Sequence, residues 1–172
     1  MRILKFAIIS VVVFFFMLTA LSLVFPSNVR LSRTINVGVP KGKVLAALND
    51  LHTWPEWNRF VSATPLTGKT FSDPSSGQGA FLRSDQLLLT ITAAGADSVR
   101  ASWTKPGGRS LQNGFDIWPA PGSDSLTVQE WFDFHFRWYP WEKFQGLIYD
   151  RQLGPLMEES LAGLKRYVEN SH

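Results

Sequence analysis

The chain has 172 residues, which is enough for one domain and a short additional segment but not for two domains. Arg2 and Lys5 flank an uncharged stretch, and the rest of the chain then carries 15 basic and 14 acidic residues, a net charge of +1. A domain this close to neutral lacks the basic surface that nucleic-acid binding requires, so we expect no nucleic-acid partner. The absence of cysteine excludes disulfides, thiolate nucleophiles and cysteine metal sites.

An uncharged apolar run extends from Phe6 to Phe25. A helix of this length, at about 1.5 Å per residue, covers the roughly 30 Å hydrocarbon core of a bilayer. We therefore predict a short tail (1–5), a transmembrane anchor that contacts the lipid bilayer (6–25), a linker (26–28) and a domain (29–170).

A cleaved signal peptide is the alternative, because Arg2 and Lys5 can serve as its basic region and Ala20-Leu21-Ser22 as its cleavage site. The apolar run exceeds the roughly 7–15 residues of a typical signal peptide, which favours the anchor. Arg2 and Lys5 also favour a cytoplasmic N-terminus, but basic residues follow the run as well, so the side of the membrane occupied by the domain stays open.

The domain begins with β-branched residues that alternate with polar ones from Val29 to Val37, which predicts a strand. Lys41–Asn49 then has one apolar face and predicts a short helix. A second helical piece is expected over Trp54–Phe60, with Thr53 as its N-cap and Pro55 in its first turn.

Turns rich in Gly, Pro and Asp divide the next 70 or so residues into short segments, which predicts an antiparallel meander. The expected strands are Leu66–Phe71, Gly79–Arg83, Leu87–Ala93, Ser98–Thr104, Leu111–Trp118 and Ser125–Phe136.

The C-terminal segment changes to a helical period at Phe144, and Gly154-Pro155 should break or kink this helix. Beyond Pro155, a broad apolar stripe needs a partner, and the sheet is the obvious one. The residues of the stripe are Leu156, Met157, Leu161, Leu164, Tyr167 and Val168.

Four motifs follow one another along residues 30–169. A strand precedes Pro40 and Val44; Asn49-Asp50 precedes Trp54-x-x-Trp57; Thr127-x-x-x-Trp131 lies in the final strand; and Asp150-x-x-x-Gly154, Glu159, Leu161 and Leu164-Lys165 lie in the terminal helix. Together they resemble the START-like superfamily, also called SRPBCC or polyketide cyclase/dehydrase-like, and its bacterial members with one N-terminal transmembrane helix.

The resemblance implies an α+β helix-grip fold, in which a curved antiparallel sheet wraps around the long C-terminal helix and two short helices follow the first strand. It also implies an apolar cavity for lipids, sterols, polyketides or similar molecules, and a single-pass location in a bacterial inner membrane. Some members are enzymes, so the fold alone settles neither activity nor substrate.

Aromatic and aliphatic side chains are the candidates for the wall of such a cavity, although Trp54 and Trp57 are better explained as core packing. The candidate ligand-binding residues are Phe81, Trp103, Phe115, Trp131, Met157 and Leu161.

Phe132, Phe134 and Phe136 alternate with polar residues and should face the core. The segment that follows, Trp138–Trp141, has a second interpretation as a cavity mouth or a membrane-interface contact.

Glu130 is the one candidate catalytic group, because it interrupts an apolar face and would be a buried acid if that face lines the cavity. A twist or bulge that places Glu130 in solvent is the interpretation we favour. His52, His135 and His172 are too few and too scattered to predict a metal site, and we expect no cofactor.

Our leading hypothesis is therefore a membrane-anchored, non-enzymatic module that binds a hydrophobic small molecule or lipid. The alternatives are a cyclase/hydratase-type enzyme that uses Glu130, and a protein-interaction domain with a filled core.

Overall fold

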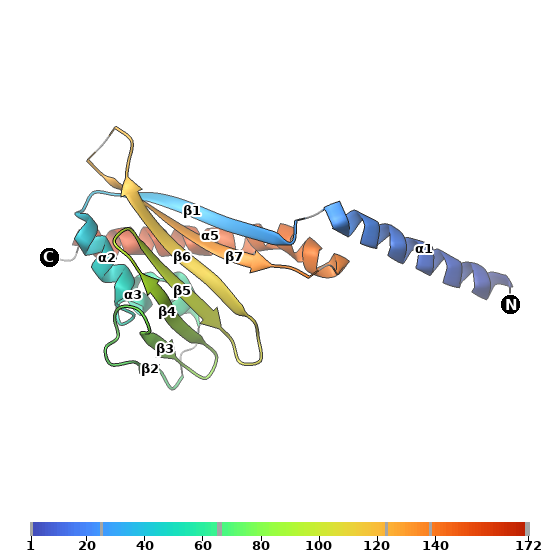
Figure 1. The fold of residues 1–172 in the computed structure, drawn as a ribbon, viewed down its shortest axis with the longest axis horizontal. Helices are drawn as coiled ribbons and strands as arrows, with labels where there is room; N and C mark the ends of the chain where they lie inside the picture. The colour runs from blue at the N-terminus through green and yellow to red at the C-terminus, as the bar shows by residue number, and fades with distance from the viewer. Residues whose placement is uncertain (1, 25, 65–66, 123, 138, 171–172) are drawn as a thin grey trace.

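The computed structural model describes residues 2–24, 26–64, 67–122, 124–137 and 139–170. Its first element, α1, spans Arg2–Val24 and extends away from the remainder of the chain (Figure 1). Among the described residues, α1 is the helix whose length and apolar composition are sufficient to cross a membrane. The predicted anchor is thus helical as far as Val24, and Phe25 lies outside the described residues.

Seven antiparallel strands form one sheet in the order β1-β7-β6-β5-β4-β3-β2. From β2 onwards each strand pairs with the next along the chain, so the predicted meander is confirmed, and β1 returns to pair with β7. The strands are β1 (Asn28–Val37), β2 (Thr70–Phe71), β3 (Phe81–Arg83), β4 (Leu88–Ala94), β5 (Ser98–Thr104), β6 (Ser110–Pro119) and β7 (Leu126–His135).

Three short helices, α2 (Lys41–Asn49), α3 (Trp54–Trp57) and α4 (Arg59–Ala63), connect β1 to β2. Thr53 occupies the predicted N-cap position of α3, but its hydroxyl donates to the carbonyls of Ala47 and Asp50 and makes no cap bond to α3. Asn58 instead separates α3 from α4, and its side-chain oxygen accepts from the backbone N–H groups of Phe60 and Val61.

The terminal helix α5 runs from Pro140 to Asn170 without the expected break, with Pro155 inside it. Arg33 of β1 crosses the helix at Gly154 and binds Asp150 at 2.7 Å and Glu158 at 3.0 Å. A Cβ atom on Gly154 would lie 2.5 Å from the Arg33 guanidinium, so glycine provides the space for this crossing. The two ion pairs join the turns on either side of Gly154-Pro155 to the same strand, which favours a continuous helix.

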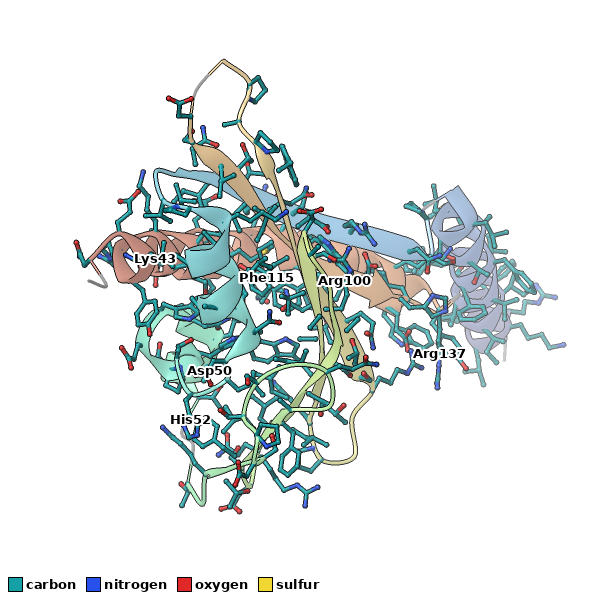
Figure 2. All side chains as sticks on the ribbon, turned by 60° about the vertical axis from the view of Figure 1, so that its left-hand side comes forward. Lys43, Asp50, His52, Arg100, Phe115 and Arg137 are labelled. Atoms are coloured by element: carbon teal, nitrogen blue, oxygen red, sulfur yellow. The ribbon has the colours of Figure 1, made fainter. Side chains whose placement is uncertain are left out.

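The sheet curves around α5. The short helices α2 and α3 contact α5 at the end of the fold that lies away from α1 (Figure 1). Trp54 and Trp57 pack their rings against Phe115 of β6 at 5.7 and 5.9 Å, which confirms their role in the core. Phe115 lies where the sheet meets the helices (Figure 2). This arrangement is the expected helix-grip fold: a long helix held in a curved antiparallel sheet.

Candidate functional site

A groove of about 1570 Å³ lies at the end of the sheet where β1 begins and β7 ends. The β5–β6 hairpin, α4 and the N-terminal half of α5 supply its other walls. Apolar and polar residues both line the groove. The apolar ones that the argument uses are Phe60, Trp103, Phe132, Phe134, Phe136, Tyr149 and Leu153. The groove is large enough for a lipid or a drug-sized ligand.

The inner half of the groove is lined by rings that contact one another. Phe132 lies 5.2 Å from Phe60 and 6.1 Å from Trp103, measured between ring centroids. Phe132 and Trp103 are buried and Phe60 is half-buried, so these three rings close the groove towards the core. Ring pairs at such distances attract one another beyond their area burial, which makes this end of the groove well ordered.

The outer half of the groove is formed where β7 meets α5. Phe134 of β7 and Phe136, which follows the last residue of that strand, both contact the ring of Tyr149 of α5, at 4.9 and 5.7 Å between ring centroids. Leu153 follows Tyr149 by four residues and lies on the same helix face. Trp141 stands at the rim with 57% of its surface exposed.

Charged side chains also line this groove: Arg30, Asp85, Lys105, Arg109, Asp133 and Glu142. Arg30 binds Asp133 at 2.6 Å, and Glu142 accepts a hydrogen bond from the backbone N–H of Arg137. Within the described part of the chain, Lys105 of the hairpin makes no ion pair. The groove therefore combines an aromatic inner end with charged and polar side chains elsewhere in its lining.

Glu130 is fully buried, so the expectation that a twist or bulge places it in solvent is wrong. Asn113 of β6 donates weakly to its carboxyl at 3.5 Å and more closely, at 2.9 Å, to the carbonyl of Trp131. Burial raises the pKa of Glu130 to about 8, and the Asn113 hydrogen bond opposes this only in part. Glu130 is therefore a neutral carboxylic acid at pH 7.

The Glu130 carboxyl lies outside the groove lining, one inward-facing position before Phe132 in β7. Its Oε2 atom has no hydrogen-bond partner, while the Asn113 side-chain oxygen accepts from the Trp103 indole at 3.4 Å. A polar path thus runs from the groove wall at Trp103 through Asn113 to an acid behind it.

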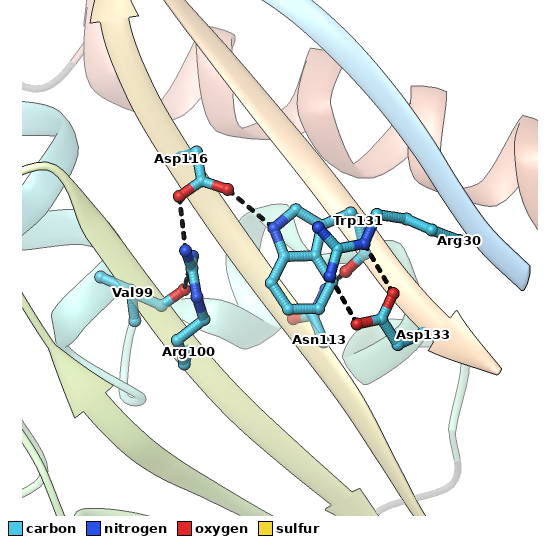
Figure 3. A network of polar contacts seen from close by, with 7 residues as sticks. All are labelled: Arg30, Val99, Arg100, Asn113, Asp116, Trp131 and Asp133. Carbon is cyan, nitrogen blue, oxygen red and sulfur yellow. Dashed lines mark hydrogen bonds and ion pairs between the residues drawn. The ribbon is translucent and has the colours of Figure 1, made fainter. Parts of the chain in front are cut away.

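Trp131 lies on the opposite, outer face of the sheet (Figure 3). Its ring is stacked between Arg30, with the guanidinium carbon 4.1 Å from the ring centroid, and Arg100 at 4.9 Å. Asp116 accepts from the indole N–H at 2.8 Å and from Arg100 at 2.7 Å. The ring lies close over Gly114, where a Cβ atom would be 2.4 Å from it.

The six sequence candidates for ligand binding are placed in different parts of the fold. Trp103 lines the groove. Phe115, Met157 and Leu161 are buried in the core, Trp131 is on the outer face, and Phe81 is a half-buried residue of β3 under the guanidinium of Arg83.

Sequence reasoning missed Tyr149 and Leu153 as groove residues. Their spacing of four is the available signal, but only the pairing of α5 with β7 shows that this helix face meets the groove.

The histidines lie apart. His52 stacks on Phe71 with 4.0 Å between ring centroids, His135 shares a hydrogen bond with Asn28, and His172 lies outside the described residues. Within the described ranges, no three His, Cys, Asp or Glu side chains gather as metal ligands would.

No protein-family model and no curated protein sequence matches the chain. Solved structures do. The protein of unknown function SA2116 from Staphylococcus aureus superposes with a TM-score of 0.59 at 12% identity, over 83% of this chain and 95% of that one. Truncated norcoclaurine synthase from Thalictrum flavum gives a TM-score of 0.57 at 11% identity, over 84% and 96%.

DynU16, a protein of the dynemicin biosynthetic locus, gives a TM-score of 0.55 at 18% identity. The match covers 84% of this chain, which spans about half (48%) of DynU16. Likeness at such identities is evidence of fold, and function depends on the site. The sheet order, the position of α5 within the curved sheet and these structural neighbours together establish the helix-grip fold that the resemblance to the START-like, or SRPBCC, superfamily implied.

Proposed function

We propose that this protein binds a hydrophobic small molecule or lipid in the groove between β7 and α5, and that α1 anchors it in a membrane. The observation that carries the proposal is the groove itself, about 1570 Å³ in volume, with the contacting rings of Phe60, Trp103 and Phe132 at its inner end. The structural neighbours support it, because folds of this kind hold ligands between sheet and helix.

Apolar burial supplies the affinity in this proposal. A ligand that buries roughly 300 Å² of apolar surface gains about 7 kcal/mol at 25 cal/mol per Å², before the cost of its lost freedom is subtracted. The ring cluster of Phe60, Trp103 and Phe132 receives the apolar end, and the polar lining near Lys105 meets the polar end. We therefore favour a binding module over an enzyme.

Native mass spectrometry of the full chain, released gently from mild detergent, tests the proposal. Leu153→Trp adds a ring from α5 into the groove, whereas Gln152→Trp adds the same ring at the neighbouring exposed position and is the matched control. We expect an apolar adduct on the parent protein and on Gln152→Trp, and its loss from Leu153→Trp. Parent protein without any adduct, or an adduct that persists in Leu153→Trp, would contradict binding in this groove.

The second candidate function is a cyclase/hydratase-type reaction that uses Glu130 as a general acid. Its support is the buried, neutral carboxyl linked through Asn113 to the groove wall at Trp103. A substrate would reach Glu130 only after the rings of Trp103 and Phe132 move aside. In this case Glu130→Gln would retain the bound molecule but stop its conversion, and identical product recovery from both proteins would remove the candidate.

The third hypothesis, a protein-interaction domain, depended on a filled core. The open groove speaks against it.

A further inference from the structure

Exposed apolar side chains of the domain gather at the end nearest α1. Outside α1, the described large hydrophobic residues with high exposure are Trp118, Trp141 and Ile148. Trp141 and Ile148 both belong to the N-terminal part of α5, and the Tyr139 ring stacks on Trp141 with 4.9 Å between centroids. Trp141 is exposed and Tyr139 is half-buried, and a stacked aromatic pair at the surface is typical of a contact with a partner.

The C-terminal turns of α1 indicate which partner this is. Leu18 and Thr19 are half-buried and Ser22 is buried, whereas almost all of the remaining described residues of α1 are exposed. These three positions share one helix face, and α1 contacts α5 (Figure 1). Since Ser22 belongs to the uncharged run that we place in lipid, the start of α5 lies beside the end of the membrane-spanning segment.

The connection between α1 and the sheet is short and tied down. Only the two residues Pro26 and Ser27 separate the end of the apolar run from β1, and the backbone N–H of Phe136 donates to the Ser27 carbonyl at 2.8 Å. Asn28 then pairs directly with His135. This end of the domain is therefore held against the end of α1 and cannot move away from it on a free linker.

We propose that the start of α5, together with Tyr139 just before it, is a membrane-docking surface, in which Tyr139 and Trp141 lie in the lipid headgroup region beside the end of α1. Tryptophan and tyrosine favour this region because their rings are apolar and their N–H and O–H groups remain hydrated. The partner is the lipid bilayer, continuous with the surface that surrounds α1.

The same surface explains how a ligand enters. Trp141 also stands at the rim of the groove, so the groove opens next to the headgroups. An apolar molecule then moves between the bilayer and the groove without crossing water. This matters because the transfer of apolar surface into water is unfavourable. This inference rests on the proposed function for the role of α1 as an anchor and for the presence of a ligand.

The absence of cysteine makes the docking surface directly testable, because a spin label can be attached at one introduced cysteine in the full chain. The variants are Trp141→Cys at the proposed surface, Phe14→Cys in the middle of α1, and Trp118→Cys as the matched control. Trp118 is also an exposed tryptophan, but it pairs with Thr127, about 26 Å along β7 from His135 at roughly 3.3 Å per residue.

The labelled proteins are placed in lipid nanodiscs, and collision with oxygen, which concentrates in lipid, is compared with collision with a water-soluble nickel chelate. We expect the oxygen-to-nickel ratio to be highest at 14, several-fold higher at 141 than at 118, and lowest at 118. The same nanodiscs are extracted with solvent to detect a bound apolar molecule.

Each other outcome has a distinct meaning. A label at 141 that meets nickel as freely as the label at 118, with 14 still shielded, overturns the docking surface and leaves the anchor intact. A label at 141 shielded from both reagents indicates a protein partner or a second copy and also overturns it. A label at 14 that is open to nickel removes the anchor and the docking surface together. Docking at 141 without any extracted molecule upholds this inference and contradicts the proposed binding function instead.

Discussion

Replacing Glu130 by Gln should change how the stability of the domain depends on pH. The carboxyl is fully buried, its single side-chain donor is Asn113 at 3.5 Å, and its Oε2 atom has no partner. Gln has almost the same shape as the protonated acid but cannot ionise. The variant therefore removes the ionisation of one buried group and leaves the packing nearly unchanged.

The direction and the size of the effect follow from the raised pKa. Below about pH 4.5 the Glu130 carboxyl is protonated in both the folded and the unfolded chain and adds no pH dependence. Between about pH 4.5 and 8 only the unfolded chain releases the proton, so the free energy of unfolding falls as pH rises. At roughly 1.36 kcal/mol per pH unit, the loss is at most about 5 kcal/mol and is complete above pH 8.

Urea unfolding of the full chain in mild detergent, followed by tryptophan fluorescence between pH 4.5 and 9, measures this difference. We expect parent and Glu130→Gln to have similar stability at the acidic end and the variant to be more stable by several kcal/mol at the alkaline end. Glu56→Gln, on the exposed first turn of α3, should follow the parent across the range. Parallel curves for parent and Glu130→Gln would refute the assignment of a neutral buried acid.

Three further substitutions should change stability in defined directions, each measured by thermal unfolding. Gly114→Ala forces the Trp131 ring away from the sheet and should cost about 1–3 kcal/mol, and an unchanged melting temperature would contradict the observed stacking. Gly42→Ala, in α2 with open space around its Cβ position, should instead raise stability by about 0.5–1 kcal/mol, so a loss there would contradict the helix. Asn58→Ala removes the cap that binds the N–H of Val61 and should cost about 1–2 kcal/mol, whereas Asn58→Asp should retain most of it.

Local patterns in the sequence predicted most of the elements. The bounds of β5 and of α2 agree with the prediction at both ends, because alternation in Ser98–Thr104 and one apolar face in Lys41–Asn49 are sufficient signals. The strand predicted over Leu66–Phe71 is reduced to Thr70–Phe71, and residues 65–66 lie outside the described part. The domain boundaries and the membrane span stay predictions.

The faces of the sheet were harder to predict than its strands. Alternation shows that Glu130 and Trp131 point to opposite faces, but not which face receives the helix. Sequence reasoning favoured solvent for Glu130 and the cavity wall for Trp131, whereas the structure buries Glu130 on the inner face of the sheet and places Trp131 on the outer face. The reason is tertiary: Arg30 and Arg100, distant in sequence, provide the guanidinium groups between which the indole stacks.

The continuity of α5 has a similar origin. Gly154-Pro155 is a local signal for a break, and no local pattern reveals that Arg33, more than a hundred residues earlier, binds the turns on both sides. Tertiary contacts of α5, which include the burial of Met157, Leu161 and Leu164 in the core as well as these ion pairs, outweigh the local preference at this position.

The pairing of β1 with β7 also has a consequence for the order of events during biosynthesis. Asn28 and His135 are partners, so the first strand stays without its neighbour until over a hundred further residues have been translated. At about 5–20 residues per second, this takes roughly 5–20 s. In the proposed topology α1 has already left the ribosome and entered the lipid by then, so the sheet closes while the chain is tethered, at a fixed distance from the membrane and from neighbouring copies. Tethering limits encounters between unfinished sheets, a hazard for folds that depend on distant strand pairs.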